Sequence, residues 1–199
     1  MINKAKEFLG IGKDGKYELM DYYNNFCYLQ VAANRKYKIR KTDDWCAMFT
    51  TVIAHMCGLN AHQFPFEVSV WYQAQIAKER GLWFTDPTKA TPNDLIVYDW
   101  KKGNRYNHVG FVVGNENGFI RAIEGNKNDT VGYRTVKHTS TSIQGFIRVD
   151  VVDLDTGIDH NLRIAMLAIA VLKGRLGNGL ERKQKLGDDF DAVQKLIND

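Results

Sequence analysis

The sequence of 199 residues has few cysteines, few prolines and no long hydrophobic run. Three cysteines are too few, and odd in number, to form the disulfide framework that stabilises small secreted domains. The most apolar run covers residues 164–172, far short of the ~20 residues that a membrane-spanning helix needs. The N-terminal residues also lack the apolar stretch of a signal peptide. These absences predict a chain that stays in a reducing cytoplasm and does not insert into a membrane.

A strong charge of one sign is also lacking. The sequence has 27 Lys and Arg against 23 Asp and Glu, a formal net charge of +4. This small excess is compatible with an anionic partner such as a bacterial wall. No helix shows the clustered Arg and Lys of a nucleic-acid-binding protein, so we expect no nucleic acid partner. The 44% of hydrophobic residues is enough for a core and argues against disorder.

The apolar pattern changes twice along the chain. Its first part has helical periodicity, and after Pro92 short β-type runs alternate with turns rich in Gly and Asn. Helices followed by antiparallel strands predict an α+β domain over residues 1–152. Helical periodicity then returns, and residues 157–199 are predicted to form a small three-helix bundle. In the first domain, helices are predicted over residues 1–9, 17–31, 45–57 and 67–80.

Cys46 stands at the start of the third predicted helix, in the segment TDDWCAMF. Residues 42–44 offer N-cap chemistry, and Gly58 is placed to end the helix. A free cysteine is most often a core residue, and from Cys46 alone that interpretation stays open. A thiol in the first helical turn feels the positive end of the helix dipole, which favours the thiolate, although Asp43 and Asp44 oppose it. A cysteine nucleophile would also need a histidine and a group that orients this histidine.

The predicted strands supply both partners. His108 opens the strand NHVGFVV, and Glu124 ends the next strand in RAIEGN. If these strands pair through the turn between them, His108 and Glu124 lie at the same end of a hairpin. A carboxylate there could hold one imidazole nitrogen and leave the other facing the thiol. Asn126 could share this role or take it over.

Five segments together resemble the CHAP domain, the cysteine, histidine-dependent amidohydrolase/peptidase family related to the NlpC/P60 hydrolases. They are WCAMF, PNDLIVYDW, NHVGFVV, IEGN and IQGFIRV, and the resemblance covers about residues 1–150. It implies a papain-like α+β fold that cleaves an amide bond in peptidoglycan through a thioester intermediate, without a cofactor. In these roles Cys46 would be the nucleophile, His108 the general base, and Glu124 and Asn126 the orienting groups.

The sequence departs from the CHAP pattern at three places. Asn93 stands where glycine is common, and Asn107 stands where aspartate is common before the histidine. Both changes suit turns. Some CHAP domains bind calcium through an acidic loop before the cysteine, but residues 36–44 are mostly basic, so we expect no metal there. Weak candidates for substrate contacts are Trp45, Ser69 and Trp71, with core packing as the alternative for Trp71.

Residues 158–198 bring a second resemblance. The segments LKGRLGNGLERKQKLG and DFDAVQKLIND resemble the CW_7 repeat, a wall-binding module, although Leu176 stands where tryptophan is common. The resemblance implies binding of the muropeptide, the disaccharide with its first peptide residues. A single copy implies either a homo-oligomer or modest wall affinity. Candidate contacts are Gly174, Arg175, Asn178 and Arg182.

These features predict a peptidoglycan hydrolase, specifically a bacteriophage endolysin that waits in the host cytoplasm and acts on the bacterial cell wall. A bacterial autolysin of the same fold, a non-catalytic wall-binding protein and a cytosolic cysteine protease are the alternatives. The bond cut is either the amide between N-acetylmuramic acid and L-Ala or a peptide bond of the stem or cross-bridge, because both need the same chemistry.

Overall fold

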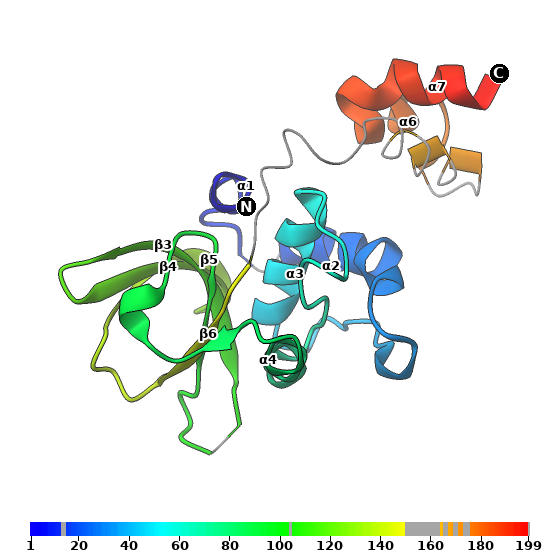
Figure 1. Cartoon of the computed structure of the whole chain (residues 1–199). Coiled ribbons are helices and arrows are strands. Elements are labelled where there is room, and N and C mark those ends of the chain that lie inside the picture. Colours follow the sequence, from blue (N-terminus) through cyan, green and yellow to red (C-terminus); the bar gives the residue numbers. More distant parts are fainter. Residues whose placement is uncertain are drawn as a thin grey trace. The chain divides into compact units, whose positions relative to one another are not determined.

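The computed structural model describes residues 1–12, 15–103 and 105–149. In the C-terminal part it describes residues 164, 167, 168, 171, 172 and 176–198. The chain divides into two compact units, Met1–Val151 and Val152–Asp199 (Figure 1). Within the described residues, no helix has the length and apolarity to cross a membrane.

The first half of the N-terminal unit is helical. Its α-helices, within the described residues, are α1 (Ile2–Lys6), α2 (Gly15–Asn25), α3 (Cys46–Met56) and α4 (Val70–Glu79). They lie where the apolar periodicity predicted helices. Helix α3 is buried over residues 46–54, which explains why its sequence is apolar on nearly all sides. It ends at Met56 with Cys57 as the C-cap, and Gly58, which follows, has the φ of +80° that a glycine after a helix end commonly adopts.

The start of α3 differs from the prediction. Trp45, not one of residues 42–44, occupies the N-cap position, and it makes no side-chain capping bond. The carboxylate of Asp43 instead accepts a hydrogen bond from the N–H of Arg40, and that of Asp44 accepts one from Asn126. The predicted cap is therefore wrong, because contacts outside the helix occupy both acidic side chains. These contacts hold the segment that leads into Cys46.

The second half of the unit is a six-stranded antiparallel sheet in the order β1-β6-β2-β3-β4-β5. Asn117 and Gly118 join β3 to β4, with φ angles of +51° and +78°. These angles are typical of the two-residue turn that an Asn-Gly pair favours. Strand β1 was not predicted, because two residues are too few to show a pattern. The strands are β1 (Trp83–Phe84), β2 (Leu95–Tyr98), β3 (His108–Glu116), β4 (Phe119–Lys127), β5 (Thr130–Lys137) and β6 (Ile143–Ile147).

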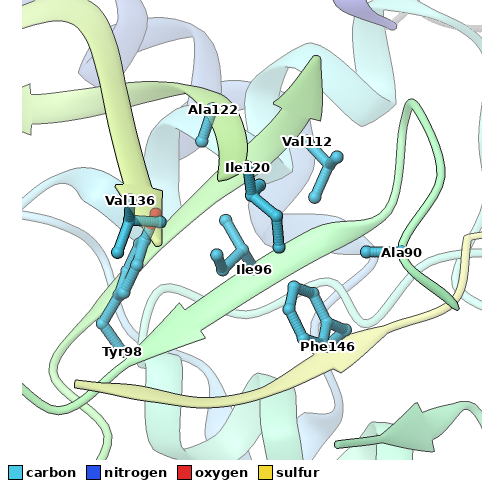
Figure 2. Close-up of a cluster of buried hydrophobic side chains, with 8 residues drawn as sticks. All are labelled: Ala90, Ile96, Tyr98, Val112, Ile120, Ala122, Val136 and Phe146. Atoms are coloured by element: carbon cyan, nitrogen blue, oxygen red, sulfur yellow. The ribbon is translucent and has the colours of Figure 1, made fainter. Parts of the chain in front are cut away.

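One face of the sheet carries a buried apolar cluster (Figure 2). Its side chains come from β2, β3, β4, β5 and β6 and from the loop before β2, and Figure 2 shows them converging. Alternate residues of a strand point to opposite faces, so Leu95 and Val97 of β2 lie on the other face. They pair with Phe111 and Val109 of β3, and all four side chains are fully buried. The members of the cluster are Ala90, Ile96, Tyr98, Val112, Ile120, Ala122, Val136 and Phe146.

Helix α3 packs against strands β3 and β4. At Gly125 the approach is close, because a Cβ atom there would lie 2.5 Å from the Cβ of Phe49 and 3.0 Å from the Trp45 ring. A glycine in β4 thus lets the first turn of α3 lie directly on the sheet. This close packing brings the start of α3 to the strands that carry the candidate site.

The described part of the C-terminal unit contains α6 (Gly179–Leu186) and α7 (Phe190–Asn198), joined by a short 3-10 turn. Leu176, Leu186 and Val193 are buried. The first of the three predicted helices falls on residues 161–175, most of which lie outside the described residues. The described residues therefore do not support a three-helix bundle.

Candidate active site

Three elements of the N-terminal unit bring Cys46, His108 and Glu124 together. Cys46 is the first residue of α3, His108 is the first residue of β3, and Glu124 lies in β4. Nε2 of His108 lies 3.0 Å from Oε2 of Glu124. An ionised carboxylate only accepts hydrogen bonds, so Nε2 carries the proton in this contact. The Cys46 thiol is the other group that acts on His108, and Nδ1 is the nitrogen left for it.

These contacts make His108 unusually basic. Burial alone would lower the pKa of His108, because a buried imidazolium loses hydration. The hydrogen bonds to Cys46 and Glu124, together with the negative charges of both, outweigh burial and raise its pKa from 6.5 to about 9. His108 therefore holds a proton firmly at neutral pH, as a base that has taken the proton of a thiol must do.

The Glu124 carboxylate is fully buried and has two cationic partners. Besides His108, Nε of Arg134 donates to Oε1 at 2.9 Å and to Oε2 at 2.7 Å. Burial would raise the pKa of Glu124, but the hydrogen bond and charge of His108 and those of Arg134 hold it below its usual value. Glu124 is thus a fixed carboxylate that stays ionised at neutral pH.

The sequence analysis missed Arg134. It lies on β5, where it pairs with Ala122 of β4 and is therefore a diagonal neighbour of Glu124 on the same face. Its guanidinium carbon lies 4.7 Å from the centre of the Trp100 ring, which stacks on Tyr98. No local pattern marks Arg134, because only the pairing of β4 with β5 brings it to the site.

The side chain of Asn126 hydrogen-bonds Asp44. Nδ2 of Asn126 donates to Oδ1 of Asp44 at 2.9 Å. Asn126 has a φ of +58° and lies in the irregular part of β4, between Glu124 and Lys127. The bond joins β4 to the segment just before Cys46. That Asn126 orients His108 remains a prediction.

The two turns that depart from the CHAP pattern have clear physical roles. Asn93 has a φ of +77°, a conformation that glycine adopts freely and that asparagine tolerates. Asn107 donates to Asp99 at 2.7 Å and accepts from the N–H of Trp100 at 3.1 Å. These bonds fix the turn that leads into His108, so the Asn107 amide stabilises this turn in place of an aspartate.

The three predicted substrate contacts differ in exposure. Trp45 is only 1% exposed, and its Nε1 donates to Asp129 at 3.1 Å, so its ring is a core element and is not available to substrate. Ser69 is half-buried at the N-cap of α4 and makes no side-chain capping bond. Trp71 is half-buried, and its ring centre lies 5.2 Å from that of Tyr106, two residues before His108. The prediction for Trp45 is therefore corrected, and those for Ser69 and Trp71 remain predictions.

Two of the four predicted wall contacts lie in the described part of the tail. Asn178 is exposed at the N-cap of α6 and accepts a hydrogen bond from Arg182 at 2.9 Å. Arg182 also donates to the carbonyl of Gly177 and to Oε1 of Gln194, both at 3.0 Å. Arg182 thus joins the segment at the start of α6 to α7. Gly174 and Arg175 lie outside the described residues.

A group of three or more His, Cys, Asp or Glu side chains that could hold a metal ion is absent from the described residues. His55, near the end of α3, contacts the Tyr22 hydroxyl through Nδ1 at 3.0 Å. Burial lowers the pKa of His55 to about 4. His55 is therefore neutral at physiological pH, and it shares a hydrogen bond with Tyr22.

Comparison with known families assigns both units. The model of the CHAP domain matches residues 36–126, a span that contains Cys46, His108, Glu124 and Asn126. The chain therefore contains a CHAP domain, which implies a hydrolase acting on peptidoglycan. The model of the CW_7 repeat, a cell-wall-binding repeat, matches residues 165–199. No curated protein matches the chain.

Proposed function

We propose that this protein is a cysteine-dependent peptidoglycan amidase or endopeptidase in which Cys46 is the nucleophile. The observation that carries the proposal is the continuous series of contacts from Cys46 through His108 to Glu124. A nucleophile, a base and a carboxylate that orients the base are the groups that covalent amide hydrolysis needs. A cysteine that only fills the core would not require a buried histidine and an ionised carboxylate beside it.

The reaction proceeds in two halves. His108 takes the thiol proton, and the Cys46 sulfur attacks the amide carbonyl carbon to form a C–S bond. The C–N bond breaks as His108 returns the proton to the leaving amine, and a thioester remains. Water then attacks the thioester while His108 takes one of its protons. The C–S bond breaks, the acid product leaves, and His108 returns the proton to the sulfur.

The start of α3 suits the negative charge that develops on the carbonyl oxygen. The first intrahelical hydrogen bond runs from the N–H of Phe49 to the carbonyl of Trp45 at 2.9 Å. The N–H groups of residues 46–48 therefore have no acceptor within the helix. We assign the N–H of Cys46 as one donor to the oxyanion, because it lies beside the attacking sulfur.

We propose that the C-terminal unit brings the enzyme to the wall by binding the muropeptide through Gly174, Arg175, Asn178 and Arg182. The pairing of a wall hydrolase with a wall-binding repeat suits a bacteriophage endolysin. Such a protein should lyse susceptible bacteria when added from outside. A bacterial autolysin of the same fold would have the same chemistry.

The test is a digest of purified peptidoglycan, with the released fragments identified by mass spectrometry. We expect the wild type to create new amino termini and Cys46→Ala to create none while still binding the wall. Cys57→Ala is the matched control, because Cys57 lies at the other end of α3, and it should behave as the wild type. New L-Ala termini would identify an amidase, and Gly, Lys or D-amino-acid termini an endopeptidase. Release by Cys46→Ala would exclude Cys46 as the nucleophile, and no release by any variant would favour a binding-only protein.

A further inference from the structure

We propose that Arg134 is a positioning residue of the site: its guanidinium fixes the Glu124 carboxylate and, through it, the ring of His108. The proposal rests on the function proposed above and adds a residue outside the span that matches the CHAP model. Its basis is geometric, because a single Arg134 nitrogen donates to both oxygens of Glu124.

Glu124 has no exposed surface through which water could orient it. A buried carboxylate needs cationic partners and hydrogen bonds to remain ionised and fixed. Among the described residues, the cationic groups that donate to this carboxylate are Nε2 of His108 and Nε of Arg134. Oε2 accepts from both, so the position of Arg134 directly limits where Oε2 can lie relative to Nε2 of His108.

Arg134 is itself held in place. The Trp100 ring lies against its guanidinium, and this ring stacks on Tyr98 with 4.7 Å between the ring centres. Tyr98 is fully buried and pairs with His108 across β2 and β3. Trp100 lies in the turn just after β2 and is 39% exposed. Arg134 therefore lies between the partly exposed Trp100 ring and the buried carboxylate, and the tyrosine on which this ring stacks pairs with His108.

A lysine would not reproduce this arrangement. The guanidinium presents its N–H groups in a planar fork and stacks flat on an aromatic ring, whereas an ammonium group is a point charge on a flexible chain. Arg134→Lys should therefore keep a positive charge near Glu124 but hold the Glu124 carboxylate less firmly in one orientation. Arg134→Met keeps the approximate length and removes both.

The experiment measures hydrolysis of solubilised peptidoglycan fragments by Arg134→Met and Arg134→Lys. It also measures the pH dependence of Cys46 alkylation by iodoacetamide in a Cys57→Ala background, where the remaining cysteine, Cys27, is fully buried and has a pKa raised by burial. We expect Arg134→Met to lower kcat about 10- to 100-fold with KM within about twofold, because a buried acceptor loses its partner. Alkylation at neutral pH should slow, and its acid limb should move to higher pH. Arg134→Lys should recover part of each change.

Arg121→Met is the matched control. Arg121 lies on β4, and its guanidinium carbon lies 3.9 Å from the centre of the Tyr133 ring. This substitution removes the same kind of stacking contact from the same sheet, and it should leave both measurements unchanged.

Two results would overturn the proposal. One is Arg134→Met with wild-type kcat and an unchanged alkylation profile. The other is activity lost only in proportion to the unfolded fraction measured by circular dichroism, with an unchanged profile in the folded protein. Alkylation needs no wall substrate, so it tests Arg134 even if the wild type releases nothing from peptidoglycan and the proposed function fails.

Discussion

The side chain of Glu124 lies directly over the backbone of Gly110. A Cβ atom at Gly110 would lie 2.5 Å from Cγ of Glu124 and 2.9 Å from the carbonyl oxygen of Ile123. His108 and Gly110 are two residues apart on β3 and therefore face the same side of the sheet. The missing side chain at Gly110 is what lets Glu124 cross β3 and reach Nε2 of His108.

Gly110→Ala should therefore impair the site. The added methyl group must push Glu124 away from His108, and we expect kcat to fall at least about tenfold. Overpacking should also lower the free energy of unfolding by about 1–3 kcal/mol. Gly114→Ala on the same strand is the control, because a Cβ atom there meets nothing within 4 Å. Hydrolysis assays and urea unfolding measure both effects, and equal activity of the two variants would contradict this account.

Glu124→Gln should change the pH dependence of hydrolysis. In the wild type, His108 must be protonated to supply the leaving amine, so activity should fall as pH rises through about 9, the raised pKa of His108. Burial lowers the pKa of His108, and the Glu124 charge opposes this effect. Without that charge the pKa of His108 should fall. The basic limb of kcat/KM should then move to lower pH, and kcat should fall about 10- to 100-fold.

The measurement is kcat/KM between pH 5 and pH 10.5 for the wild type and the variant. Glu116→Gln is the control, because Glu116 is exposed at the far end of β3 from His108. A basic limb that stays at the same pH in Glu124→Gln would show that this carboxylate does not set the proton affinity of His108.

The sequence predicted the parts of the site that have local signals. Cys46 begins an apolar helix, and His108 and Glu124 stand near the open end of one hairpin whose Asn-Gly turn sets the strand pairing. Arg134 could not be found in this way, because its role depends on the register of β4 with β5 across an irregular segment. The sequence also could not show whether the Trp45 ring is buried or exposed, since burial depends on the tertiary structure.

The pKa of a second, half-buried histidine shifts in the opposite direction, and this shift should affect stability. Burial lowers the pKa of His55 from 6.5 to about 4, so between these pH values the unfolded chain binds a proton that the folded chain does not. The stabilising effect is full above pH 6.5 and is lost as pH falls toward 4.

His55→Gln should remove this part of the pH dependence. Urea unfolding at pH 7.5 and pH 4.5 should show that the wild type loses about 2–3 kcal/mol more than the variant over this interval. His62→Gln is the control, because His62 is exposed and should keep the wild-type dependence. Equal losses in the wild type and His55→Gln would mean that His55 is protonated in the folded protein.

In the wall-binding unit, Arg182 has a structural role that can be separated from ligand binding. Its three hydrogen bonds to Gly177, Asn178 and Gln194 connect the start of α6 to α7. Arg182→Met should therefore loosen this unit and speed hydrogen exchange over residues 176–198 by about tenfold. In a Cys46→Ala background, retention on purified walls should fall with it. Lys183→Met, which changes an exposed neighbour, should alter neither. If retention falls while exchange stays at the wild-type rate, Arg182 acts on the wall ligand directly and its internal bonds contribute little.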